Sequence, residues 1–551
     1  MRLAKEANLT RVHVEAQLNR ARALSLRRPY GTAGAILGSA FPTLKRGAKK
    51  HCAYGADART FIAQFSIAVL GLGLLVGCNV GPKYHAPTAP AVTAYTRQPQ
   101  LAQTAASAGP AGNAQRFDSS ASIPAQWWMV FHSPELNGMI EKALANGPTL
   151  AQATARLREA QEDLNARTGA TKYPTVTGNA TVEGEQPNLT AYGIPFPNPS
   201  PFALLNGSVA VSYALDIFGA NRRAIEGLQA NRDYENWQLE GARLMLAGNV
   251  VSAAVRQAEV RKQIELTKQL LALEQRELEI TAARNQAGGV SEADVESKKS
   301  VLAQTQAAIP PLDAELDIVN HQLAVLMGKS PAEARIPELS LDALQLPENL
   351  PLSLPSALVR QRPDIRAAEA LLHEASANVG VATANLYPQI VLSASGGGIG
   401  TSFVNGGDLW NVASSFTQPI YNGGALRAEK RKAEAAYQEA NSAYRQTVLE
   451  AFGQVADTLT SIDHDAQTLT ARSDVAAEAD ASYRIAHGRY EAGGISELAL
   501  LEAQRQQLQS ELDRTSAAAA RFADSATLFE ALGGGWWNAA TADPKMQASA
   551  R

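Results

Sequence analysis

The sequence predicts an internally duplicated, mainly helical protein that also contains a few β-strands. The first observation is a short string, Ala-Gly-Gly-Val/Ile-Ser-Glu, which occurs at 287–292 and again at 492–497. The second is that the segments around each string follow the same order in both halves of the chain. The third is the length of the uninterrupted helical stretches, which exceeds that of ordinary globular helices.

Each copy of the string has the composition of a tight turn between two long antiparallel helices. Glycine adopts positive φ angles without steric cost and ends one helix, and a serine then caps the next helix. The predicted turns are Gly288-Gly289-Val290 and Gly493-Gly494-Ile495, which lie 205 residues apart. A repeat of that size indicates a duplicated domain rather than a solenoid of small units.

Composition excludes several classes of protein. Aromatic residues make up only 6% of the 551 residues, which favours helices rich in Ala and Leu. Residues 1–77 contain 12 Lys and Arg against 3 Asp and Glu, so the remainder contains 38 against 50, a net charge of −12. An acidic body argues against a nucleic-acid partner, since phosphate binding requires clustered positive charge. Two cysteines and eight scattered histidines predict neither a disulfide framework nor a metal site, and we expect no cofactor.

The N-terminal region has the features of a secretory signal. An extension with a basic region, residues 1–60, precedes an apolar region at 61–77 that is too short and glycine-rich for a confident transmembrane helix. Residues 1–50 exceed what a signal needs, so either the true start lies downstream or they form a basic extension. Leu75-Val76-Gly77-Cys78 resembles the bacterial lipobox, which implies a covalent lipid on Cys78 and, with Asn79 after it, the outer rather than the inner membrane. The simpler alternative is a buried cysteine after an apolar helix.

The segment at 78–125 is rich in Pro, Ala, Thr, Gln and Gly and shows no hydrophobic periodicity. Such a composition is typical of an extended linker. We therefore expect a lipid-anchored tether between the membrane and the body of the protein.

The first repeat, residues 126–330, begins its first long helix near Pro148. Apolar side chains recur at helical spacing until Tyr173-Pro174 ends that helix. Two strands then alternate apolar with small polar residues around a loop at 186–206, and a helical stretch follows from 220 to 286. The apolar residues of these two strands are Val176, Ala180, Val182, Val209, Val211, Tyr213 and Leu215.

The second repeat, residues 353–535, has the same order and follows an equatorial linker at 331–352. We expect its first helix at 358–385, with Arg362-Pro363-Asp364 at the first full turn and Tyr387-Pro388 at its end. Two alternating strands follow, and residues 536–551 form a C-terminal tail. We also expect a glycine-rich loop, formed by 396–400 and 405–407, between the two strands. A long helix then ends at Glu491, and a last helix ends near Leu532.

The helices and strands have different implications. Residues 220–286 would span roughly 100 Å as one helix, so they predict coiled-coil-like rods or the wall of a tube. The alternation in the strands is ordinary for a soluble sheet, but in the outer membrane it would place lipid on one side and water on the other. Four strands cannot close a barrel and open edges are not tolerated in lipid, so membrane strands would require a barrel shared between protomers.

An ordered set of motifs runs through both repeats and resembles one family, from about Cys78 to Trp537. The sequence looks like a TolC-like outer membrane factor, of the NodT-type lipoproteins that serve tripartite RND-type pumps. The motifs are the lipobox, Trp127-Trp128 with Ser133-Pro134-Glu135-Leu136, the two Tyr-Pro corners, Leu215-Asp216-Ile217-Phe218-Gly219, Arg360-Gln361-Arg362-Pro363-Asp364, Gln418-Pro419-Ile420-Tyr421-Asn422-Gly423-Gly424 and Ala531-Leu532-Gly533-Gly534-Gly535-Trp536-Trp537.

The resemblance implies a homotrimer in which each protomer gives four transmembrane strands to a shared barrel and extends a long helical barrel into the periplasm. A small equatorial region would lie at about 325–356 and in the C-terminal tail. The implied function is that of an outer membrane channel subunit, which passes small molecules from an inner-membrane pump and a periplasmic adaptor to the exterior. The resemblance implies that the protein catalyses no reaction.

The resemblance also assigns roles near the two turns. The turns themselves would contact the adaptor, and Leu498 and Glu502 would close the channel, with Asp294 tying the helices shut. A further acidic position of the family is Ala499 here. Three copies of Glu502 around a narrow pore would repel one another, raise their pKa values and favour cations. The simpler alternatives are a solvated surface carboxylate at Glu502 and glycines that serve turn geometry alone.

Two other classes of function explain the sequence less well. An envelope enzyme is disfavoured because the chain lacks a Gly-x-Ser-x-Gly elbow, and because no lysine follows the glycines at 396–400 as in a phosphate loop. Asp463-His464-Asp465 lies within a helix, where neighbouring side chains point in different directions. A periplasmic coiled-coil adaptor or scaffold lipoprotein would explain the lipid and the helical hairpins, but neither the two strand hairpins nor the duplication.

Overall fold

A computed structural model describes residues 79–97, 102–402 and 406–541. The predicted basic region, signal peptide and lipidated Cys78 lie outside the described residues. The helices are α3 (Pro134–Asn146), α4 (Pro148–Lys172), α5 (Ala220–Gln286), α6 (Glu292–Leu326), α7 (Pro355–Gln361), α8 (Pro363–Ala384), α9 (Ala425–Glu491) and α10 (Glu497–Ala531). The strands are β1 (Arg116–Asp118), β2 (Thr175–Glu185), β3 (Phe202–Leu215), β4 (Asn349–Pro351), β5 (Gln389–Gly400) and β6 (Gly406–Thr417).

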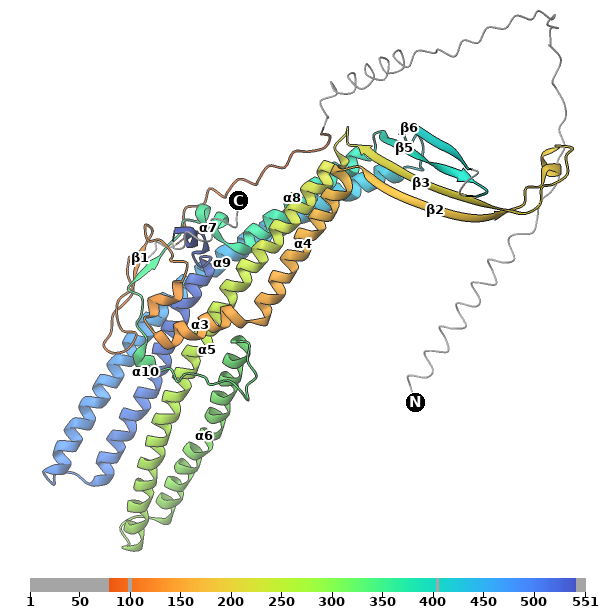
Figure 1. The fold of residues 1–551 in the computed structure, drawn as a ribbon. Helices are drawn as coiled ribbons and strands as arrows, with labels where there is room; N and C mark the ends of the chain where they lie inside the picture. The colour runs from red at the N-terminus through yellow and green to blue at the C-terminus, as the bar shows by residue number, and fades with distance from the viewer. Residues whose placement is uncertain (1–78, 98–101, 403–405, 542–551) are drawn as a thin grey trace, which may run out of the picture. The chain divides into compact units, whose positions relative to one another are not determined.

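The chain is duplicated, as predicted. The order α4, β2, β3, α5, α6 in the first half is repeated as α8, β5, β6, α9, α10 in the second. Both α5 and α9 contain 67 residues, and both α6 and α10 contain 35. Figure 1 shows the long helices running away from the strands and turning back as two hairpins. Within the described residues, no helix is both long and apolar enough to cross a membrane.

The four long strands form one antiparallel sheet in the order β2-β3-β5-β6. Its register confirms the predicted alternation, because Tyr213 lies opposite Leu392 and Ser212 lies opposite Ser393. Apolar side chains therefore share one face of the sheet and small polar side chains share the other. Every residue of the outer strands β2 and β6 is exposed, and each has an open edge within the described part of the chain.

The predicted loops between the strands were too long. The strand β3 begins at Phe202 rather than after 206, because Phe202 pairs with Glu185. The glycines expected in a loop at 396–400 lie inside β5, and those at 406 and 407 lie inside β6. Glycine is needed at Gly397, where an added Cβ atom would lie 2.2 Å from the carbonyl oxygen of Gly207 on β3. Close approach of two backbones therefore explains glycine in a strand.

The single helix predicted at 358–385 was also wrong, since α7 and α8 are separate helices. They are divided at Arg362, whose ψ angle of 126° is extended. Proline disfavours helical conformation in the preceding residue and is well suited to begin a helix, as Pro363 does here. The extended Arg362 is buried, and its guanidinium donates to the carbonyl oxygen of Ala531 at 2.9 Å.

The described parts of the predicted tether, residues 79–97 and 102–125, are packed against the helical body rather than free. Tyr84 stacks on His373 of α8 with ring centroids 4.2 Å apart, and the Tyr95 hydroxyl donates to the carbonyl oxygen of Ser353 at 2.7 Å. Arg521 of α10 is buried and donates to the carbonyl oxygen of Asn113 and to Gln115 Oε1, both at 3.1 Å. Strand β1 then pairs in parallel with β4 of the linker.

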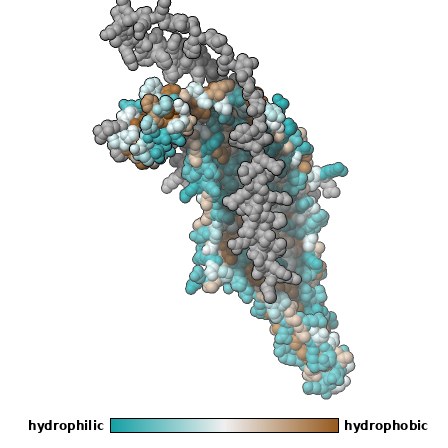
Figure 2. Space-filling model, turned by 90° about the vertical axis from the view of Figure 1, so that its right-hand side faces the viewer, coloured by the Kyte–Doolittle hydropathy of each residue, from teal (hydrophilic) through white to brown (hydrophobic). Residues whose placement is uncertain are grey.

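The main hydrophobic core lies midway along the long helices, where α3 and the linker cover them. Trp127 stacks on Phe529 with centroids 5.6 Å apart, and Phe131 contacts Phe522 edge-on at 6.4 Å. Figure 2 shows that hydrophilic residues dominate the visible surface of the helices. The aromatic residues at the start of the first repeat therefore hold the middle of the long helices together.

Candidate functional site

The two turns at the ends of the long hairpins have the same backbone geometry. Gly288 and Gly493 have φ angles of +74° and +72°. The following glycine nitrogen donates five residues back in each, from Gly289 to Arg284 at 2.8 Å and from Gly494 to Arg489 at 2.7 Å. Nothing lies within 4 Å of a Cβ atom built on either positive-φ glycine. Figure 1 places both turns at the end of the hairpins that is remote from the strands.

The caps that follow the two turns differ. Ser291 accepts from the Asp294 backbone nitrogen at 3.3 Å, and Asp294 accepts in return from the Ser291 nitrogen at 2.9 Å, which completes a capping box. Hydrogen bonds from the Ser291 side chain and then its backbone lower the pKa of Asp294. Ser496 accepts from the Ala499 nitrogen at 3.3 Å, but Ala499 has no carboxylate to return a bond. Asp294 is therefore engaged in capping its own helix.

Leu498 and Glu502 lie one turn apart on α10, where Leu498 is half-buried and Glu502 is exposed. Arg505 donates to Glu502 from its Nε atom at 3.2 Å, and this bond lowers the pKa of the Glu502 carboxyl within one chain. Sequence analysis missed Arg505, although its position three residues after Glu502 is the spacing of a helical ion pair. Each Glu502 thus carries its own countercharge.

A polar network above the turns joins the two hairpins. Lys298 of α6 lies 2.6 Å from a carboxylate oxygen of Glu277 of α5, whose side chain is fully buried. Arg276 of α5 donates to Glu497 of α10 at 2.9 Å, across the junction between the hairpins. Burial raises the pKa of Glu274, which lies one turn before this pair on α5. The leucines packed along the same junction are Leu266, Leu270, Leu273, Leu501 and Leu508.

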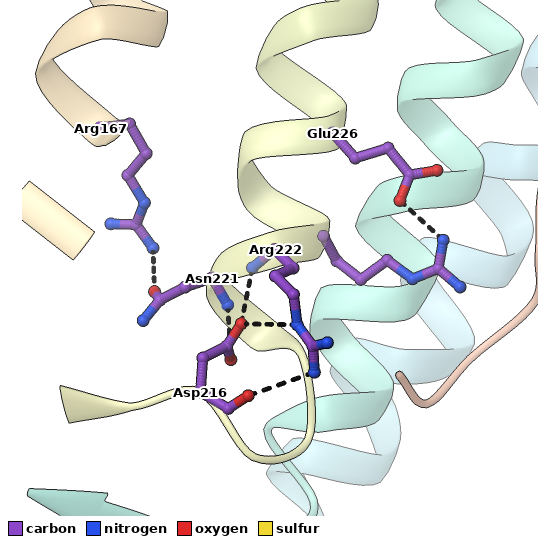
Figure 3. Close-up of polar contacts among 6 residues, drawn as sticks. Arg167, Asp216, Asn221, Arg222 and Glu226 are labelled. Carbon is purple, nitrogen blue, oxygen red and sulfur yellow. Dashed lines mark hydrogen bonds and ion pairs between the residues drawn. The ribbon is translucent and has the colours of Figure 1, made fainter. Parts of the chain in front are cut away.

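A second polar cluster fixes the corner where β3 leads into α5 (Figure 3). The carboxylate of Asp216 accepts from the backbone nitrogens of Asn221 and Arg222 at 3.1 and 2.8 Å, which satisfies the first turn of α5. Arg167 of α4 donates to the side-chain oxygen of Asn221 at 3.1 Å. These hydrogen bonds therefore connect α4, the end of β3 and the start of α5 at the junction between the strands and the helices.

A cavity of about 1190 Å³ lies beside the aromatic core and is lined mainly by apolar residues such as Trp128, Leu244 and Trp536. Its polar lining includes Glu240 and Arg243, which form an ion pair of 2.7 Å. Burial raises the pKa of Glu240 despite this partner. Among the described residues, no group of three or more His, Cys, Asp or Glu could hold a metal ion.

The structure consists of two long helical hairpins that continue from a four-stranded sheet. Comparison with known protein families identifies the family that has this arrangement. Two segments, residues 139–329 and 354–534, match the model of the outer membrane efflux protein family, one in each half of the chain. The chain belongs to this family. Its fold is the internally duplicated, TolC-like fold that the sequence predicted.

Individual relatives agree with this assignment. The chain is 30% identical to the pyoverdine export outer membrane protein OpmQ of Pseudomonas aeruginosa, over 76% of this chain and 89% of that protein. It is 26% identical to the probable outer membrane lipoprotein SilC of Salmonella typhimurium, over 86% and 100% of the two chains. The solved structure of the outer-membrane channel OprN superposes with a TM-score of 0.72 at 28% identity and covers 83% of this chain and all of that chain.

Proposed function

We propose that this outer membrane efflux protein is one subunit of a homotrimeric channel that passes small molecules to the cell exterior without doing chemistry on them. The observation that carries the proposal is the sheet β2-β3-β5-β6, which has apolar residues on one face, small polar residues on the other and open edges at β2 and β6. Lipid does not tolerate open edges, so the edges must be paired by further copies of the chain. Three copies would give a barrel of twelve strands with a polar lumen.

The turns Gly288-Gly289-Val290 and Gly493-Gly494-Ile495 are proposed to contact a periplasmic adaptor, which connects the channel to an inner-membrane RND-type pump. Their closely similar, exposed backbones support this role, because a partner would meet nearly the same shape twice in each protomer. The driving energy is proposed to come from the pump.

The gate is proposed to lie just above the turns, at Leu498 and Glu502, with the first hairpin held to the second by Arg276 and Glu497. Opening would separate the hairpins and break that ion pair. Asp294 would act by fixing the start of α6, because its carboxylate is already used in the capping box.

A covalent lipid on Cys78 is proposed to add an anchor near the strands. Asn79, the next residue, packs against Gly219 at the strand–helix corner, and the Val80 nitrogen donates to the carbonyl oxygen of Phe218 at 3.3 Å. Adjacent Cα atoms are about 3.8 Å apart, so the lipid would enter the membrane beside the sheet. The name of SilC describes that relative as a probable lipoprotein.

Single-channel recording in a planar bilayer tests the channel. Purified protein should give stable conductance steps, and Leu498→Ala or Glu502→Ala should raise the open probability. Glu333→Ala, which removes an exposed carboxylate far from the turns, is the control. A folded protein that conducts neither as wild type nor as Glu502→Ala would contradict the proposal and favour a scaffold lipoprotein. Conductance that is equal in all variants would contradict only the gate.

A further inference from the structure

The outermost helices of each protomer continue the open edges of its sheet. Helix α4 packs on α5, α5 on α8 and α8 on α9, which is the same order as the strands β2, β3, β5 and β6. Helix α4 leads directly into β2, and α9 follows β6. If β6 of one copy pairs with β2 of the next, α9 of the first copy therefore comes to lie beside α4 of the second.

The outward face of α4 carries two carboxylates. The helix buries Leu150, Ala160 and Leu164 against the body. Within the described part of the chain, Glu159 forms no ion pair, and Glu162 accepts from the Asn165 amide at 3.2 Å. The exposed residues opposite the buried stripe recur at spacings of three and four, and they are Ala151, Ala155, Glu159, Glu162 and Ala166.

The outward face of α9 carries two cations at a comparable height. This helix buries Tyr444, Val448 and Ala451 against its neighbours. Arg431 has no ionic partner among the described residues, and Lys432 lies 3.4 Å from Glu429 in a pair whose side chains are 78% and 63% exposed. The exposed residues opposite its buried stripe are Ala428, Arg431, Lys432, Ala435 and Glu439.

We propose that Glu159 and Glu162 of α4 pair with Arg431 and Lys432 of α9 from the next copy, at a charged seam directly beneath the shared barrel. The proposal rests on the trimer proposed above. Glu162 lies about 15 Å from the strand end of α4 and Arg431 about 9 Å from that of α9, at about 1.5 Å per residue. This offset is about one helical turn, which long side chains span.

The charges also determine which faces can meet. Two α4 faces brought together would oppose four carboxylates, and two α9 faces would oppose four cations. Like charges in contact disfavour both two-fold arrangements, whereas the head-to-tail contact of α9 on α4 pairs opposite charges. Head-to-tail contacts close into rings, which is what a shared barrel requires.

Charge reversal and charge exchange test the seam. Detergent-extracted full-length protein is sized by native mass spectrometry as wild type, Glu162→Arg, Arg431→Glu and the double variant. Each single reversal should lower the ratio of trimer to monomer at least threefold, and the double variant should restore it. Arg156→Glu, an exposed reversal on another side of α4, is the matched control and should leave the ratio unchanged.

The outcomes separate the seam from the trimer. A monomeric wild type would overturn the trimer and the seam together. A trimeric wild type whose single reversals behave like Arg156→Glu would overturn the seam alone. Single reversals that dissociate the trimer without rescue in the double variant would show damage unrelated to charge pairing and would also overturn the seam.

Discussion

The two hairpin ends have similar backbone geometry but differ in the charged residues beside them. Their turns have glycine φ angles of +74° and +72° and equivalent hydrogen bonds, 205 residues apart. The first hairpin holds the pair of buried Glu277 and half-buried Lys298, and the second has Ser482 and Ala503 at the corresponding positions. The second holds the exposed pair of Glu502 and Arg505, where the first has Ser297 and Ser300. Duplication has thus kept the turn geometry, whereas each hairpin has charges of its own.

This difference separates two roles of the same motif. Glycine and serine are needed in both copies because the chain must reverse and a new helix must begin. A buried ion pair ties α5 to α6, which rigidifies the first hairpin. An exposed pair contributes little to stability, so the charged surface of the second hairpin can be rearranged at little cost in free energy. We therefore expect the first hairpin to be the stable support and the second to carry the movable gate.

The largest expected effect comes from removing the cation of the buried pair. Lys298→Met leaves Glu277 charged and without its partner in the interior, which should destabilise the first hairpin by about 3 kcal/mol. The midpoint of thermal unfolding, followed by circular dichroism, measures the loss. The control is Lys299→Met, which removes an exposed partner of Glu296 and should cost less than about 0.5 kcal/mol. Equal effects of the two variants would contradict the assigned role of Lys298.

Changing the cap residues should alter the stability of each turn separately. Ser291→Ala removes the centre of the capping box and should destabilise the start of α6 by about 1 kcal/mol. Ala499→Asp gives the second turn the missing carboxylate and should stabilise the start of α10 by about 0.5 kcal/mol. Hydrogen exchange of the amides in the first turn of each helix reports both changes. If exchange at the start of α10 does not become slower after Ala499→Asp, the second turn cannot form a capping box.

Acid should distinguish the two turns without any mutation. Asp294 has a pKa below its usual range in the folded chain, so its contribution is complete above the value of about 3.9 typical of an unfolded chain. That contribution is lost as the pH falls through the lower, folded pKa. Hydrogen exchange between pH 5 and pH 2, corrected for intrinsic rates, should show the start of α6 losing protection relative to the start of α10. Parallel losses in both helices would count against the capping box.

The smallest effect on stability is expected at Glu502. Glu502→Gln removes one charge of an exposed pair and should change the free energy of unfolding by less than about 0.5 kcal/mol. The same variant should weaken the preference of the channel for cations, because it removes negative charge at the constriction. Reversal potentials in asymmetric KCl measure the preference. Glu511→Gln, in a similar pair with Arg514 farther along α10, should leave the reversal potential unchanged.

Local features of the fold could be predicted from the sequence. The Gly-Gly-Val/Ile-Ser string determines the turn from residues within six positions, and alternation predicted the faces of the strands because side chains alternate in any strand. The break at Pro363 was missed because apolar periodicity continues through it, although proline itself was the available signal. The strand glycines were missed because only the neighbouring strand shows why Gly397 must be small.

Long-range contacts could not be read from spacing. Arg276 and Glu497 are 221 positions apart, and many other carboxylates could equally have been chosen as the partner. Arg505 was within reach of a helical-spacing argument but was passed over for the family pattern at Leu498 and Glu502. The packing of residues 79–97 and 102–124 on the body was hidden because their composition resembles that of a flexible linker.

That packing has a consequence for how the chain folds. Thr104 and Asn113 are held by Arg521, and Ile123 accepts from Asn538, so the first part of the body is completed only by residues near the end of the chain. Contacts with a sequence separation of about 410 form late and slowly, since a very long loop must close before they contribute. Export of the polypeptide across the inner membrane must therefore be finished before the body can acquire its final form, and until then the protein depends on whatever keeps an unfinished chain from aggregating in the periplasm.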